Sequence, residues 1–148
     1  MDEERVLSHL STIEQQLVSS QSEVKDIIQS GESREKFVVA VAYAAQILGI
    51  RFGTLNTMRG EDEPSDTVSI QLRTVGERLR VLATIVEQGI KSLRLNEKNR
   101  LHHTAMEALT DICTFKVVGL DLRVGGLHRT PTDDEVVLWG QGQGVAFH

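Results

Sequence analysis

The chain has 148 residues with a single cysteine, Cys113, and its N-terminus lacks the features of a secretion signal. One cysteine cannot form a disulfide within the chain, nor can it supply a thiolate metal cluster. This cysteine usage fits a reducing compartment. Residues 1–4, Met-Asp-Glu-Glu, are acidic and polar, whereas a signal peptide has a basic start followed by an apolar segment. We therefore expect a cytoplasmic protein.

The chain also lacks an uninterrupted apolar run long enough to cross a membrane. Its most apolar stretch runs from Phe37 to Leu55, and Gln46 and Arg51 interrupt it. A membrane span needs about 20 predominantly apolar residues, and an arginine near its centre costs roughly 3 kcal/mol. We interpret this stretch as a buried core helix and predict no membrane contact.

The overall composition is that of one soluble domain with an uneven charge distribution. Hydrophobic residues make up 40% and charged residues 25% of the chain, which is close to the globular average. Of the formal net charge of −5, residues 1–66 hold 12 acidic and 6 basic side chains, a net −6. Residues 67–132 hold 6 acidic and 10 basic side chains, a net +4. An acidic helix can therefore pair with a basic one, within the chain or between chains.

Residues 1–30 show the narrow apolar seam of a coiled coil. Apolar residues recur at steps of four, three and seven, and Ser20 occupies the one polar seam position. The seam residues are Val6, Leu10, Ile13, Leu17, Val24 and Ile27. Since a thin seam on a polar helix needs a partner, we predict that these residues form an interface with another chain. Packing across the helix's own domain is the equal alternative.

Residues 33–118 form the predicted helical core. Gly31 is expected to end the first helix, and Ser33 to cap a second that begins at Arg34 and runs into the 50s. Between Phe37 and Ala45 the second helix is apolar on all sides, so we expect it to be the most buried element.

A third helix has the clearest periodicity in the chain. Its apolar positions are Val68, Leu72, Val75, Leu79, Leu82, Val86, Ile90 and Leu93. The period continues from Leu101 to Phe115, which leaves open whether residues 68–118 form one helix or two. Residues 119–148 are glycine-rich and predict a short β-hairpin or an irregular tail. Its two aromatic residues, Trp139 and Phe147, are candidate contacts with a neighbouring subunit.

The predicted fold is all-α: a bundle of three to four helices with a protruding, coiled-coil-like N-terminal helix and a short β or irregular C-terminal tail. The chain then divides into an N-terminal helix at residues 1–30, a bundle core at 33–118 and a tail at 119–148.

Basic side chains on the third helix and its continuation are the candidate ligand contacts. They are Arg73, Arg80, Lys91, Arg94 and Lys98. On a continuous helix such residues could bind the phosphates of a small molecule or a nucleic acid. However, Glu77 and Glu87 interrupt the stripe, and no aromatic residue accompanies it to stack on bases. Pairing with the acidic first helix is therefore the favoured interpretation.

Two weaker constellations suggest enzymes. His103, Glu107 and Asp111 share one helix face at steps of four and could ligate a divalent metal, but no second ligand pair accompanies them. Arg123 and His128 resemble the paired Arg/His motif of some helical ribonucleases, although glycines between them disfavour a helix. We assign no catalytic residue and predict no metal or cofactor.

The function that these patterns favour is a non-enzymatic helical interaction or assembly module. It would act as a homo-oligomer or as an adaptor that binds a partner helix. Two alternatives stay open: an oligomeric binder of a phosphorylated ligand or nucleic acid through the basic helix face, and a metal-dependent or ribonuclease-like enzyme.

Overall fold

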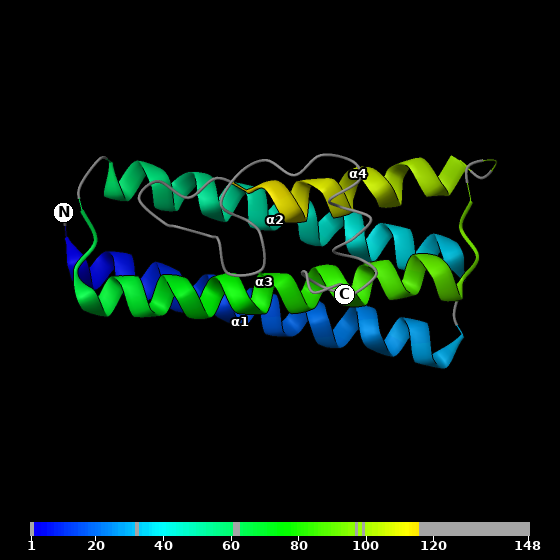
Figure 1. Ribbon diagram of the computed structural model, residues 1–148, viewed down its shortest axis with the longest axis horizontal. Helices are drawn as coiled ribbons and strands as arrows, with labels where there is room; N and C mark the ends of the chain where they lie inside the picture. The colour runs from blue at the N-terminus through cyan, green and yellow to red at the C-terminus, as the bar shows by residue number, and fades with distance from the viewer. Residues whose placement is uncertain (1, 32, 61–62, 97, 99, 116–148) are drawn as a thin grey trace.

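The computed structural model describes residues 2–31, 33–60, 63–96, 98 and 100–115. They form four helices: α1 (Glu3–Ser30), α2 (Arg34–Arg59), α3 (Asp66–Ser92) and α4 (Arg100–Thr114). The helices lie side by side in an elongated bundle, and each runs opposite to the one before it in the chain (Figure 1). The predicted all-α bundle is confirmed. The predicted tail, with Trp139 and Phe147, lies outside the described residues.

The helix ends follow local capping chemistry. Gly31 ends α1 in the left-handed region, with φ of 68°, and its N–H donates to the last carbonyl groups of the helix. The Ser33 hydroxyl accepts the N–H of Lys36 at the start of α2, as the sequence predicted. Ser65 caps α3 in the same way, accepting the N–H of Val68.

The helices are arranged as the four corners of a square. α1 contacts α2 and α3, and α4 contacts the same two helices. α2 and α3 therefore lie across the bundle from each other. With 15 residues, α4 is about 22 Å long, roughly half the length of the other three helices.

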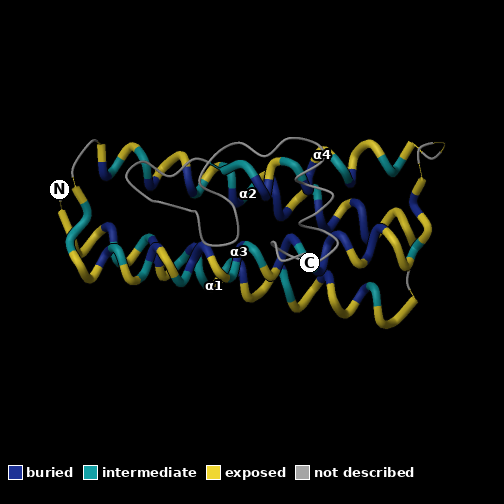
Figure 2. The backbone as a smooth tube through the Cα atoms, in the orientation of Figure 1, coloured by how far each residue is buried: buried dark blue, intermediate teal, exposed yellow. Residues whose placement is uncertain are grey.

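The N-terminal helix does not protrude, which corrects the sequence-based expectation. All six α1 seam residues are buried, and they belong to the same core cluster as the inward side chains of α2, α3 and α4. Figure 2 shows the buried positions following the inner side of each helix. Ser20 is also buried at the seam, where its hydroxyl accepts the side-chain amide of Gln16 at 2.9 Å. α1 thus finds its partner surface within its own chain.

Polar contacts reinforce the parallel pair of α1 and α3. The Glu14 carboxylate accepts the side-chain amide of Gln71 at 2.7 Å and the Nε–H of Arg78 at 3.1 Å. One acidic side chain of α1 therefore pairs with a basic side chain of α3 inside the chain, although Arg78 is not one of the five basic candidates. Such partly exposed pairs each stabilise a fold by less than about 1 kcal/mol, so they orient the helices more than they hold them.

The continuation of α3 into α4 is broken, which answers the question of one helix or two. α3 ends at Ser92, and Arg94 adopts φ of 56°, a conformation that a helix cannot include. The Nε–H of Arg34 donates to the carbonyl oxygen of Leu93 at 2.7 Å and so ties this turn to the start of α2. Asp66–Ser92 and Arg100–Thr114 therefore form two antiparallel helices.

α2 departs from the expected full burial. It is the one helix in the described part of the chain whose length and composition would allow it to cross a membrane, with a mean hydropathy of 1.6 in its most apolar window. In the bundle, 44% of that window is buried. Phe37 lies fully inside and reaches across the core to α3, where its ring packs on the backbone of Gly89.

The contact between Phe37 and Gly89 generates the first prediction. A methyl group at position 89 would overlap the Phe37 ring and lie 2.8 Å from Cδ1 of Ile28. We expect Gly89→Ala to lower the free energy of unfolding by about 1–3 kcal/mol, as overpacked cores do. Urea unfolding followed by circular dichroism measures it.

Gly53→Ala is the matched control, because it is also a helical glycine but nothing lies within 4 Å of the added methyl group. Its higher helix propensity should raise stability by up to about 1 kcal/mol. Equal unfolding midpoints for the two variants would contradict the close packing at Gly89.

Candidate functional site: an exposed apolar ridge on α2

One side of α2 presents large apolar side chains to solvent. Val39 is 67% exposed, Tyr43 is 60% exposed and Ile50 is 59% exposed. With the exposed Gln46 they recur at steps of four, three and four, so they lie in one line along the helix. We call Val39, Tyr43, Gln46 and Ile50 the α2 ridge. Single exposed apolar residues are ordinary, whereas three in one line at the spacing of a helix-pairing seam make the α2 ridge the candidate site.

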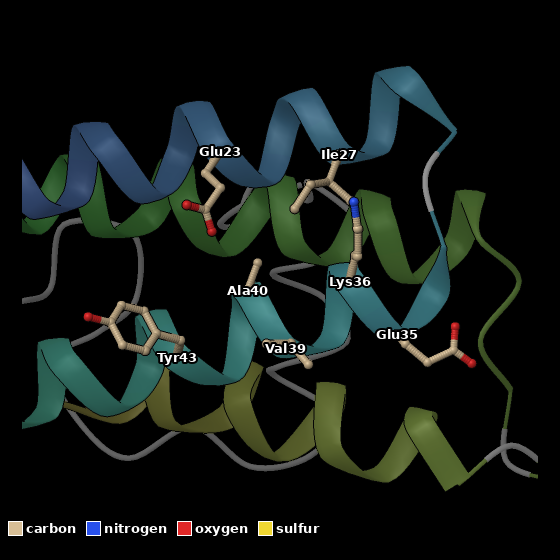
Figure 3. A pocket seen from close by; sticks show the side chains of 7 residues that line it. All are labelled: Glu23, Ile27, Glu35, Lys36, Val39, Ala40 and Tyr43. Carbon is tan, nitrogen blue, oxygen red and sulfur yellow. The ribbon is translucent and has the colours of Figure 1, made fainter.

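A groove lies on the α1 side of the ridge. It has a volume of about 560 Å³ and is lined by Glu23 and Ile27 of α1 and by Glu35, Lys36, Val39, Ala40 and Tyr43 of α2. Figure 3 shows Glu23 and Ile27 facing the helix that carries Ala40 and Lys36. Ile27 and Ala40 are buried, whereas the three charged side chains are exposed. The groove thus has an apolar floor and a charged rim.

A smaller groove lies on the α4 side of the ridge. It has a volume of about 300 Å³ and is lined by Ala42, Ala45 and Gln46 of α2 and by Thr104, Glu107, Ala108 and Asp111 of α4. The alanine side chains are short, which leaves this space between the two helices. Partial desolvation in the groove raises the pKa of the exposed Asp111, and the negative charge of Glu107 one turn away raises it further.

Carboxylates outnumber cationic groups in the lining of both grooves. Together the linings hold Glu23, Glu35, Glu107 and Asp111 against the single ammonium of Lys36, four negative charges and one positive, a formal −3. The ridge is therefore an apolar line with acidic side chains on both of its flanks.

The α1 residues predicted to form an interface are buried in the core of the bundle and are not part of the α2 ridge. Val6, Leu10, Ile13, Leu17, Val24 and Ile27 are at most 9% exposed, and their apolar surface is used within the bundle. A surface for another chain has to lie outside this seam. Ile27 alone also lines the groove beside the ridge.

The structure divides the five basic candidates between a helix and a turn. Arg73, Arg80 and Lys91 lie on α3, where the Glu87 carboxylate approaches the Lys91 ammonium to 3.5 Å. Arg94 and Lys98 follow the end of the helix. The continuous helical stripe that would align all five residues is therefore absent from the described residues.

The enzyme candidates gain no support from the geometry. His103, Glu107 and Asp111 are exposed on α4, and within the described residues no group of three or more His, Cys, Asp or Glu side chains is placed to hold a metal ion. Arg123 and His128 lie outside the described residues. Cys113 is buried, and burial together with the nearby charge of Glu87 raises the pKa of its thiol far above neutrality, which disfavours a nucleophilic thiolate.

Comparison of the chain with protein-family models, with curated proteins and with solved structures finds no match. The fold alone defines its class, a four-helix bundle in which successive helices run in opposite directions.

Sequence reasoning missed the ridge. Its residues stand in a helix that is apolar on every side from Phe37 to Ala45, so periodicity could not tell the outward side from the inward one. The available signal was the spacing of Val39, Tyr43 and Ile50, which becomes informative only when the inward residues are known.

Glu87 is a buried acidic residue whose contribution to the stability of the fold should depend on pH. It is buried on α3, and burial raises the pKa of its carboxyl group, while Lys91 opposes the shift. A raised pKa in the folded state means that the folded protein holds this proton more tightly than the unfolded chain. The contribution of Glu87 to stability is then complete below its ordinary pKa and is lost as the pH rises through the folded-state value.

We therefore expect Glu87→Gln to gain thermal stability relative to the wild type as the pH rises from about 4.5 to 7. Differential scanning fluorimetry across this range measures the difference in melting temperature. Glu77→Gln, an exposed substitution on the same helix, controls for the loss of one charge. A difference between Glu87→Gln and the wild type that is constant with pH would contradict the raised pKa.

Proposed function

We propose that the protein is a non-enzymatic interaction module that binds a helix of a partner protein along the α2 ridge. The observation that carries this proposal is the line of Val39, Tyr43 and Ile50, each more than half exposed, on the outer side of a helix whose other sides are packed. Leaving these side chains in water forfeits the stabilisation that burial of apolar surface gives, and a partner helix would recover it.

The shape of the surface suits a helical partner. From Val39 to Ile50 the ridge covers 11 residue steps, or about 16 Å of helix, which corresponds to three turns of a partner. The grooves on either side can receive side chains one turn apart, in the manner of an amphipathic helix that docks between two others. The ridge itself supplies the seam at the steps of four and three that helix pairs use.

The burial of the α1 seam supports an adaptor over the self-assembly first expected from residues 1–30, because the residues assigned to that assembly are occupied within the chain. A second copy of the chain docking on the α2 ridge is the rival occupant. It is distinguished by the mass of the complex.

Site-specific photo-crosslinking tests the proposal. With p-benzoylphenylalanine in place of Tyr43 in the full-length chain, expressed in its native cells, we expect an adduct of one discrete mass. The substitutions Val39→Ser and Ile50→Ser should abolish it. Because both side chains face solvent, this double variant should keep its free energy of unfolding within about 0.5 kcal/mol of the parent.

The control is the same crosslinker at Ile70, which is 63% exposed on α3 and so matches the ridge residues in size and exposure. It should give no adduct that depends on Val39 and Ile50. An adduct with twice the 16.4 kDa mass of the chain would assign the ridge to a second copy. If Tyr43 and Ile70 give the same adducts, or none, the ridge is not a docking surface.

A further inference from the structure

We infer that the helix bound by the α2 ridge is basic, with lysine or arginine side chains on both sides of its apolar seam. The inference rests on the proposed function and names the chemical class of the partner. Its basis is the position of two carboxylate-lined grooves on opposite flanks of one apolar line.

The acidic side chains come from three helices, so the pattern is a property of the assembled surface. Glu23 of α1 and Glu35 of α2 line the groove on one flank. Glu107 and Asp111 line the groove on the other flank, from successive turns of α4. All four residues are exposed, so a partner's side chains can reach them.

Glu107 and Asp111 lie one turn apart, and the pKa of Asp111 is raised by partial desolvation and then by the negative charge of Glu107. This α2/α4 groove has no lysine or arginine in its lining to offset them. A cationic side chain placed in the groove would relieve the repulsion.

The sign of the charge argues against the other occupants. A second copy related by a twofold axis would place a surface of formal charge −3 against its own copy, and like charges across an interface oppose association. An anionic membrane surface or a nucleic acid would meet the same repulsion. A neutral helix would bury the ridge but leave the carboxylates partly desolvated and unpaired.

The geometry also places the positive charges of the partner. Because one groove lies on each flank of the ridge, a helix centred on Val39, Tyr43 and Ile50 projects its seam-flanking side chains into both. Lysine and arginine suit these positions, since their long apolar stems can lie along the ridge while the charged ends reach the carboxylates.

Binding of three fluorescent helical peptides to the full-length protein tests the inference. The peptides share one leucine seam and differ only in the flanking residues, which are lysine, glutamine or glutamate. By fluorescence anisotropy we expect the lysine peptide to bind at least about tenfold tighter than the glutamine peptide, and the glutamate peptide to bind more weakly still. The advantage of lysine should shrink as salt rises from about 0.05 to 0.5 M, since these charges are exposed.

Charge-neutral variants locate the effect. Glu23→Gln with Glu107→Gln removes one carboxylate from each groove, and we expect it to weaken binding of the lysine peptide severalfold while leaving the glutamine peptide unchanged. Glu4→Gln with Glu77→Gln is the matched control, because it removes two exposed glutamates that line neither groove. Equal loss in both double variants would overturn the inference, because it would reflect net charge alone.

The outcomes separate this inference from the proposed function. If all three peptides bind equally and Val39→Ser with Ile50→Ser abolishes binding, the ridge is a docking surface but its partner is not basic. If no peptide binds, or if that variant binds like the wild type, both proposals fail. Ridge-dependent binding to phosphatidylserine vesicles, with no preference among the peptides, would assign the ridge to a membrane instead.

Discussion

The structure depends on one constraint: α2 carries apolar side chains around its whole circumference, yet a helix at the corner of a bundle can bury only the part that faces its neighbours. The inward part of α2 contacts α1 and α4, and Phe37 reaches across to Gly89 of α3. The outward part has no neighbour among the described helices. Val39, Tyr43 and Ile50 are therefore left in solvent by the same arrangement that buries the rest of the helix.

The other helices set the chemistry around that exposed line. α1 uses its entire seam to pack within the chain and contributes Glu23 to one flank of the α2 ridge. α4 is short, and its exposed carboxylates Glu107 and Asp111 form the other flank. The proposed specificity for a basic helix thus comes from residues that are far apart in the sequence and share no motif.

Much of the fold could be predicted from local patterns, because each pattern has a local cause. The seam of α3 requires a helix, and the caps at Gly31, Ser33 and Ser65 follow from backbone geometry and the needs of the first N–H groups. The position of α1 could not be predicted in this way. A seam with a period of 3.5 residues shows that a helix needs a partner, but not whether that partner belongs to the same chain.

The candidate site was beyond sequence reasoning for a related reason. Which side of α2 faces outward is decided by where α1 and α4 pack, not by α2 itself. The positions of the basic residues could not be predicted for a different reason, since aligning Lys91 with Lys98 requires a helix that continues past Ser92, and the turn at Arg94 ends it. The apolar period is nearly continuous on both sides of that turn, so it left open whether one helix or two would form.

The most direct measurement is an NMR titration of the ¹⁵N-labelled full-length protein with the lysine-flanked peptide. We expect the largest amide shifts along the α2 ridge and at Glu23 of α1 and Glu107 of α4, with α3 little changed. The opposite result, shifts centred on Arg73 and Arg80 of α3 with the ridge unchanged, would contradict the assignment of α2 as the binding surface.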